Sequence, residues 1–444
     1  MKSTKKASNA GKFYPSDKTE LKNLIETFTI ESTPFQSRAV IVPHAGYAYS
    51  GKLAAKGIQT LIQDAENIFL ISPAHFERIV GCTVPAYSYF ETPLGKVKVN
   101  TNIVKDLISL GMCENCNNAF EHEHSIEVQL PLIKTFFPNA KIVPIIYGCE
   151  NYKTISALIK YFWADEKNVF VISSDLSHYY PAKEAIKIDN YTANLIENNE
   201  IKNFEMDMAC GAVGICGLAD FAKEQNYTLI RNGLTNSGET TGDTSRVVGY
   251  GTWFLYEGYK NSFIKKYYSD LVLSICKRSI ESGLHLGSSL PETYPEVFYE
   301  RGACFVTLQI HGNLRGCIGS VIAHRALVID LIKNAHAAAF TDPRFNSLTL
   351  NEFANVEIEV SLLSKPEQIY FKDENELLRQ IEPYKDGIII RDGSRQGVYL
   401  PDVWAALPEK NKFLQSLKLK AGIDKNKSFE NINVFKFSST KISQ

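Results

Sequence analysis

The stretch AVIVPHAGYAYSG, residues 39–51, decides how the first part of the chain folds. Its first four residues are all apolar, which is typical of a strand that is buried on both faces. The apolar run ends at Pro43 and His44, and a glycine follows two residues later. The sequence therefore predicts a buried strand that carries a histidine at its carboxyl end.

Four further runs in the first part of the chain, up to about Gly258, are also apolar at nearly every position. They read NIFLISPAH, AKIVPIIYG, NVFVISSDLSH and RVVGYGTWFLY. Between them lie segments of helical length, such as residues 50–65 and 154–162, which fit crossover connections between parallel strands. We therefore predict an α/β fold for residues 1–260, with a largely parallel sheet flanked by helices.

The pattern changes in residues 261–444. A helix is expected over residues 271–282, and NVEIEVSLL, residues 355–363, alternates apolar and polar side chains as a half-exposed antiparallel strand does. The stretch GIIIRDGSRQGVYLP predicts a hairpin around Asp392 and Gly393. This second part is predicted to be a smaller α+β domain with an antiparallel sheet.

Length and composition restrict the class of protein. A chain of 444 residues is too long for one ordinary core and indicates about two or three domains. The net charge of −1 gives no electrostatic reason to expect nucleic acid or a membrane surface as a partner. No apolar run approaches the ~20 residues that span a bilayer, and the N-terminus lacks the apolar core of a signal peptide. The odd number of cysteines, nine, fits a reducing compartment, so we expect a cytoplasmic protein.

Polar side chains follow several of the predicted strands at the point where each strand ends. His44 and His75 follow two of them, and Asp175 and His178 follow a third. In open parallel sheets, ligands bind beyond the carboxyl ends of the strands, because the loops converge there. A single histidine in such a place is more often a packing residue, but three at equivalent positions favour one shared site.

A third metal ligand is less clearly marked. The stretch MACGAVGICG offers Cys210 and Cys216. Two imidazoles with one anionic ligand form a common face for a metal that keeps open coordination positions. A lone cysteine can equally be a small buried apolar residue, and the residues alone leave this alternative open.

The first part of the chain resembles the Memo family. The matching stretches, in chain order, are ASNAGKFYP, IVPHAGYAYSG, ISPAHF, EHSIEVQLP, SSDLSHY, ACG and GDTSRVVGYG. The resemblance implies a fold similar to the class III (LigB-type) extradiol dioxygenases. It also implies a metal site of His44, His75 and Cys210, with Asp175 and His178 beside it. The dioxygenases have a carboxylate as third ligand, and a thiolate shifts the preference toward softer metals, including copper(I).

The second part resembles the AMMECR family. The matching stretches are LRGCIGS, TDPRF, the predicted hairpin and FLQSLKLKAGI, in which Lys418 stands where the family usually has a cysteine. With a radical S-adenosylmethionine protein, these two families form the AmmeMemoRadiSam system. The resemblance implies that this chain joins the A and B components and has a radical S-adenosylmethionine protein as partner.

The stretch LRGCIGS, residues 314–320, is expected to be a glycine-flanked turn that follows the strand ACFVTLQIHGN. Glycines let a backbone approach another group closely, and Arg315 would bind an anion or a carboxylate. Arg315 and Cys317 are therefore candidate substrate-binding residues. A tight turn in which Cys317 only packs remains the alternative.

The functional hypothesis is a metal-dependent oxidoreductase of the dioxygenase-like class. Fe2+, with copper or zinc as alternatives, would be bound by His44, His75 and Cys210, and His178, oriented by Asp175, would act as acid and base.

Two further residues, His124 and Tyr47, are candidates for the wall of the substrate pocket. The substrate is expected to be a small molecule or a peptide, with no nucleic acid and no membrane involved. Two alternatives without turnover stay open: a module that sequesters metal or buffers redox state, and a peptide-docking site. Oxygen consumption with turnover separates the first hypothesis from both.

Overall fold

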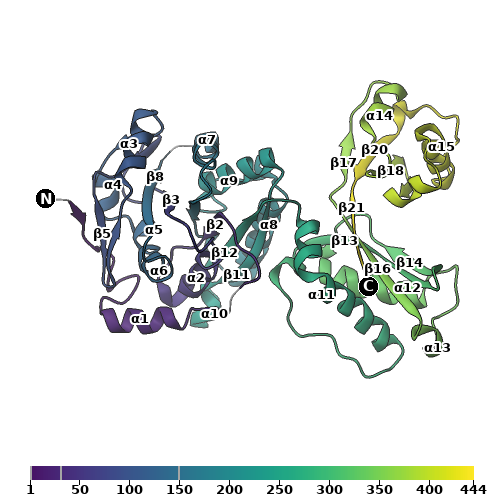
Figure 1. Ribbon diagram of the computed structural model, residues 1–444, viewed down its shortest axis with the longest axis horizontal. Helices are drawn as coiled ribbons and strands as arrows, with labels where there is room; N and C mark the ends of the chain where they lie inside the picture. Colours follow the sequence, from purple (N-terminus) through teal and green to yellow (C-terminus); the bar gives the residue numbers. More distant parts are fainter. Residues whose placement is uncertain (1–2, 31–32, 149–150) are drawn as a thin grey trace. The chain divides into compact units, whose positions relative to one another are not determined.

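The computed structural model describes residues 3–30, 33–148 and 151–444. The chain divides into two compact units, Met1–Lys260 and Asn261–Gln444 (Figure 1). No helix in the described ranges is long and apolar enough to cross a bilayer.

Four parallel strands form the centre of the main sheet of the first unit. They lie in the order β2 (Ala39–Val42), β9 (Asn168–Ser173), β3 (Asn67–Pro73) and β8 (Lys141–Tyr147). Nearly every residue of these strands is buried, as the continuous apolar runs predict. The prediction of parallel strands is thus confirmed for the centre of the sheet.

The edges of this sheet are mixed, so the predicted largely parallel sheet is only partly correct. Strand β12 (Val247–Tyr256) pairs antiparallel with β2, with β10 (His178–Tyr180) and with β11 (Thr228–Asn236). Strand β4 (Cys82–Val84) pairs antiparallel with β8. Only the short α10 (Ser237–Thr241) lies between β11 and β12, and a parallel crossover needs about a dozen residues or more.

Helices cover both faces of the sheet. A Cβ atom added to Gly57 of α2 (Lys52–Ile58) would lie 2.5 Å from Cγ1 of Val42, and one added to Gly214 of α9 (Ala212–Gln225) would lie 3.0 Å from Cγ2 of Ile172. Val42 pairs with Ser173, the residue after Ile172, and successive residues of a strand face opposite ways. Helices α2 and α9 therefore lie on opposite faces (Figure 1).

The other elements of this unit are shorter or peripheral. The helices are α1 (Lys18–Glu26), α3 (Thr101–Ser109), α4 (Asn118–Glu121), α5 (His124–Glu127), α6 (Leu130–Phe136), α7 (Tyr152–Phe162) and α8 (Ala182–Glu197), with a π-helix η1 (Tyr47–Gly51) before α2 and a 3-10 turn η2 (Ile201–Asn203). The strands are β1 (Thr4–Lys5), β5 (Tyr89–Thr92) and β6 (Gly95–Lys98), which form a small separate sheet, and β7 (Glu114–Asn115) beside β4.

The second unit has two antiparallel sheets, as expected for the α+β class. One sheet has the order β14 (Asn313–Gly319), β13 (Arg301–Ile310), β16 (Val356–Leu363) and β21 (Ser439–Ser443), with β15 (Arg325–Ala326) on β13. The other has the order β17 (Glu367–Ile369), β20 (Asn433–Phe437), β18 (Gly387–Asp392) and β19 (Arg395–Tyr399). Its helices are α11 (Lys260–Gly283), α12 (Leu327–Phe340), α13 (Leu350–Phe353), α14 (Glu374–Gln380) and α15 (Lys410–Lys420), with 3-10 turns at Glu296–Phe298, Pro401–Ala405 and Phe429–Asn431.

Two local predictions hold in this unit. Strands β18 and β19 pair antiparallel around Asp392 and Gly393, and Gly393 has the positive φ of 61° that such a turn requires. The helix expected over residues 271–282 lies within α11, which is interrupted at Tyr268 (φ −137°, ψ 19°).

The predicted turn LRGCIGS is instead a strand. Residues Leu314–Gly319 belong to β14, and the turn lies earlier, at His311 and Gly312, whose φ angles are 50° and 75°. A Cβ atom at Gly316 would lie 2.1 Å from the carbonyl oxygen of Ala338 in α12. The glycine does permit a close approach, but the group approached is the backbone of a helix.

The packing of α2 on the sheet predicts that Gly57→Ala destabilises the protein. The new methyl group would meet Oγ1 of Thr252 at 2.4 Å and Cγ1 of Val42 at 2.5 Å, and both residues lie in strands of the central sheet. We expect a loss of about 1–3 kcal/mol, although alanine is the better helix former. Calorimetric unfolding of the full chain measures it, with Lys52→Ala, an exposed position of α2, as control. An unchanged or raised unfolding temperature for Gly57→Ala would contradict this packing.

Candidate metal centre

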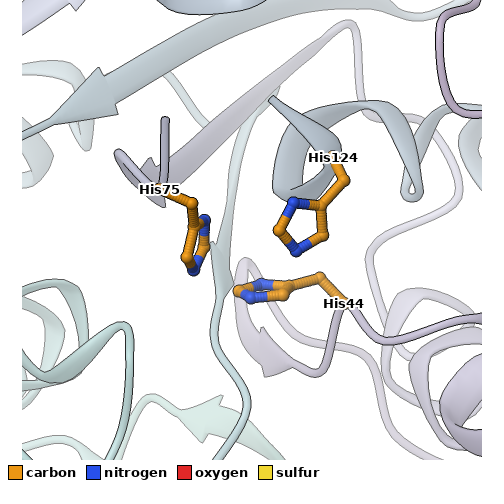
Figure 2. A group of neighbouring side chains, drawn as sticks. All are labelled: His44, His75 and His124. Carbon is orange, nitrogen blue, oxygen red and sulfur yellow. The ribbon is translucent and has the colours of Figure 1, made fainter. Parts of the chain in front are cut away.

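Three histidines converge near the carboxyl ends of the central strands (Figure 2). His44 follows β2, His75 follows β3, and His124 is the first residue of α5. The ring centroids lie 5.1 Å (His44–His75), 5.3 Å (His44–His124) and 4.7 Å (His75–His124) apart. One ligand atom from each side chain lies within 4.8 Å of the others. This spacing allows one metal ion to bind all three.

The ring of His44 is held in one tautomer by its neighbours. Oγ of Ser173 donates its proton to the carbonyl oxygen of Ser125 (2.8 Å), so it can only accept from Nδ1 of His44 (2.9 Å). The proton of His44 therefore lies on Nδ1, and Nε2 keeps its lone pair. Burial, reinforced by the nearby His75, lowers the pKa of His44 to about 3, so the ring is neutral at pH 7.

His75 is oriented by a buried carboxylate. Its Nδ1 lies 2.8 Å from Oε1 of Glu123, and its backbone N–H donates to Oε2 of the same residue (2.7 Å). Burial alone would raise the pKa of Glu123, but its contacts with His75 outweigh burial and lower this pKa to about 2. A carboxylate can only accept, so Nδ1 of His75 carries the proton and Nε2 is available. Carboxylate–histidine pairs of this kind orient metal ligands.

His124 has a ring that is fixed mainly by packing. Its buried Nδ1 has no hydrogen-bond partner in the described part of the chain, although it lies 3.4 Å from Oε1 of Glu123. Phe13 stacks on the ring (centroids 4.6 Å apart, planes at 23°), and Phe76 meets it edge-on. Burial, followed by the nearby His44 and His75, lowers the pKa of His124 to about 4. The sequence placed His124 in the pocket wall, whereas the structure groups it with the two predicted ligands.

Cys210 adjoins this group through His44. Its Sγ lies 3.3 Å from Nε2 of His44 and accepts the backbone N–H of Asp175 at 3.2 Å. Burial, and then the charge of Asp175, raise the pKa of the thiol to about 12. Without a cation Cys210 is therefore a neutral thiol at pH 7, and metal binding would have to release its proton.

Asp175 and His178 lie at the same edge of the sheet. Oδ1 of Asp175 accepts the backbone N–H of His44 (2.8 Å), which fixes the start of the loop after β2. His178 is half-buried at the start of β10. The hydrogen bonds of the described residues do not join its ring to Asp175, so the orienting role of Asp175 stays a prediction.

The remaining predicted site residues are Tyr47, Arg315 and Cys317. Tyr47 is buried, and its hydroxyl donates to the carbonyl oxygen of Val128 (2.8 Å). Arg315 and Cys317 belong to the second unit. Both Nε and Nη2 of Arg315 donate to the carboxylate of Glu352 (2.8 and 3.2 Å).

The sequence analysis missed the residues that orient the ligands. Ser173 and Glu123 were not among the predicted site residues, and each contacts a histidine distant in sequence. The stretch EHEH contained a usable sign, because a carboxylate beside a histidine is a common arrangement in metal sites.

Comparison with known families assigns the two compact units to two different families. Residues 5–254, more than half of the chain, match the model of the Memo-like protein family. The chain belongs to the Memo-like family. Residues 273–442 match the AMMECR1 family, so the two-domain fusion is confirmed. We call residues 1–260 the Memo-like unit and residues 261–444 the AMMECR1-like unit.

Curated relatives match the Memo-like unit along almost their whole length. A MEMO1 family protein of Aquifex aeolicus is 32% identical over 256 residues, covering 54% of this chain and 95% of that protein. One of Methanococcoides burtonii is 33% identical over 263 residues, covering 54% and 96%. Among solved structures, an uncharacterized protein of Pyrococcus horikoshii is 32% identical, with a TM-score of 0.36, and the match covers 38% of this chain and 88% of that one.

Cys317 is predicted to be the most reactive of three thiols in the AMMECR1-like unit. It is half-exposed, whereas Cys276 and Cys304 are 0% exposed, and burial raises the pKa of both. Iodoacetamide near neutral pH should therefore modify Cys317 first, as measured by peptide mass spectrometry. Urea-unfolded protein, in which all three should react at similar rates, is the control. If Cys317 stays unmodified until the protein unfolds, its side chain only packs.

Proposed function

We propose that the Memo-like unit binds a redox-active transition metal, Fe2+ in the first place, and oxidises a small-molecule substrate with dioxygen. The observation that carries this proposal is the convergence of His44, His75 and His124, with Cys210 in contact with His44. The family resemblance to class III extradiol dioxygenases supports the reaction type.

The chemistry of the donor atoms fits such a metal. Imidazole nitrogens and a thiol suit iron, copper or zinc, whereas Mg2+ and Ca2+ prefer oxygen ligands. The tautomers of His44 and His75 leave Nε2 of each ring without a proton, and Nε2 of His44 faces Sγ of Cys210. Both ligands already have the partners that orient them. The side chain of His75 is 26% exposed, so the group is open to solvent on one side. A substrate can approach from that side.

Each group at the site would have a separate role in the proposed reaction. A bound Fe2+ would supply the redox chemistry that amino-acid side chains lack. His178 would take the proton of a substrate hydroxyl, because a phenol or similar group is activated by deprotonation. Phe13, which stacks on His124, and Phe76, which meets it edge-on, would exclude water from the substrate.

Two alternative functions involve no oxidation of a substrate. Copper or zinc in the same site would give a metal-sequestering or redox-buffering module, and Cys210 favours this for copper(I). A peptide-docking module would use the same opening without oxygen uptake.

The AMMECR1-like unit is proposed to present the substrate, and a radical S-adenosylmethionine protein is the proposed partner. The proposal of this partner is based on the resemblance to the AmmeMemoRadiSam system. For Arg315, the bond to Glu352 already neutralises much of its charge, while its buried Nη1 lacks a hydrogen-bond partner in the described chain. A substrate carboxylate at Arg315 would therefore have to compete with Glu352.

The metal site predicts a graded loss of binding in variants. Anaerobic protein should bind about one Fe2+ per chain, and His44→Ala, His75→Ala and Cys210→Ala should each lose most of it. Glu123→Gln, which removes the acceptor charge beside His75, should weaken Fe2+ binding by about 10–100-fold. Elemental analysis and equilibrium titration measure these effects.

Matched controls come from the same stretches of sequence. His122→Ala and Cys216→Ala change a histidine and a cysteine outside the group and should keep full occupancy. Full iron occupancy in His75→Ala and Cys210→Ala as well would remove the proposed centre.

The proton-transfer role predicts that His178→Gln separates binding from turnover. This variant should keep its Fe2+ but lose catechol-dependent oxygen uptake by roughly 100-fold, because the base is missing. Uptake is followed with an oxygen electrode, with His122→Gln as control. Unchanged uptake would exclude His178 from the mechanism, and loss of iron would make it a ligand. If wild-type protein binds iron but consumes no oxygen with any catechol, the oxidoreductase proposal fails and the two alternatives without turnover stand.

A further inference from the structure

A short N-terminal segment, residues 5–14, is tied to helix α5 through one carboxylate. Oε1 of Glu127 accepts the backbone N–H of Asn9 (2.7 Å) and the hydroxyl of Tyr14 (2.8 Å). Oε2 accepts the backbone N–H and Oγ of Ser8 (3.1 and 3.0 Å) and pairs with Nζ of Lys5. We call residues 5–14 the N-terminal strap.

This attachment is a buried ion pair. Lys5 is 3% exposed and Glu127 is 1% exposed. Burial would raise the pKa of Glu127, but the charge and hydrogen bond of Lys5, with the other donors, lower it. Removing one partner of a buried pair leaves the other charge uncompensated, which weakens the attachment strongly. Glu127 is therefore the main side-chain anchor of the strap, which is also held by the backbone pairing of Lys5 with Phe90 in β5.

The strap carries Phe13 to the metal centre. Phe13 stacks on the ring of His124, and its carbonyl oxygen accepts the backbone N–H of Tyr47 (2.7 Å). A Cβ atom at Gly46 would lie 3.4 Å from that carbonyl oxygen, so the loop that carries His44 also lies close to the strap. His124 and Glu127 are three residues apart on α5, so one turn of helix joins the ring to the anchor.

The ring of His124 needs such a support. Ser173 fixes His44 and Glu123 fixes His75 by hydrogen bonds, but Nδ1 of His124 has no such bond in the described chain. Aromatic contacts hold the ring instead: Phe13 stacks on its face, and Phe76 meets it edge-on.

We propose that Glu127 is a positioning residue of the metal centre, which acts through the strap and Phe13 to hold His124 as a ligand beside His44 and His75. The inference rests on the proposed metal binding and adds a residue that touches no metal. It differs from a purely structural role, in which Glu127 would affect the stability of the protein but not the coordination of the metal.

The test is a Co2+ titration of the full-length chain, followed by visible absorption, because the d–d bands report the ligands of the ion. Glu127→Gln should keep about one Co2+ per chain, since the other ligands remain. It should shift the d–d bands as His124→Ala does and weaken Co2+ binding by about 10–100-fold. Combining the two substitutions should give no further loss, because both act through the same ring.

A matched control and a second variant complete the test. Glu197→Gln breaks another buried ion pair, with Arg231, and should lower stability without changing the Co2+ spectrum. Phe13→Ala leaves the Lys5–Glu127 ion pair intact and should reproduce the spectrum of Glu127→Gln. This variant can therefore replace Glu127→Gln if that variant does not fold.

Three results would overturn the inference. A wild-type spectrum and affinity in both Glu127→Gln and Phe13→Ala would leave the proposed metal site standing and exclude the positioning role. Additive losses in the combination of Glu127→Gln with His124→Ala would show that Glu127 does not act through His124. If wild-type protein binds no Co2+, the proposed function fails together with the inference.

Discussion

Because β2, β9 and β3 pair in parallel and in register, their carboxyl ends meet at one edge of the sheet. His44, His75 and Asp175 follow these strands directly, so backbone pairing alone brings residues far apart in sequence together. The buried apolar strands fix this register, since a shift by one residue would turn every side chain to the opposite face. The site is thus a consequence of strand pairing, and its chemistry depends on which side chains occupy the loops.

Helix α5 and the residue before it supply the carboxylates that orient the site. Glu123 orients His75 and Glu127 anchors the N-terminal strap, while His124 lies between them in sequence. One turn of helix thus presents a candidate ligand and two carboxylates with different tasks. Both carboxylates are at most 2% exposed, which is tolerated because each accepts several hydrogen bonds.

The sequence predicted what depends on local pattern. Continuous apolar runs gave the central strands, and Asp392-Gly393 gave a hairpin, because both signals lie within a few residues. The antiparallel direction of β12 depends on its neighbours, which an apolar run does not specify. The strand LRGCIGS was mistaken for a turn because its glycines pack against α12 and Phe305. Glu123 and Glu127 were missed because their contacts with His75 and Lys5 span 48 and 122 residues of sequence.

The central claim is that one metal ion binds between the histidines at the carboxyl ends of β2 and β3. Anomalous diffraction at the iron edge, from crystals grown anaerobically with Fe2+, tests it most directly. The account predicts a single strong peak per chain in contact with His44 and His75, with Cys210 and His124 completing the ligands. A fully occupied iron peak elsewhere on the chain, with none between His44 and His75, would contradict it.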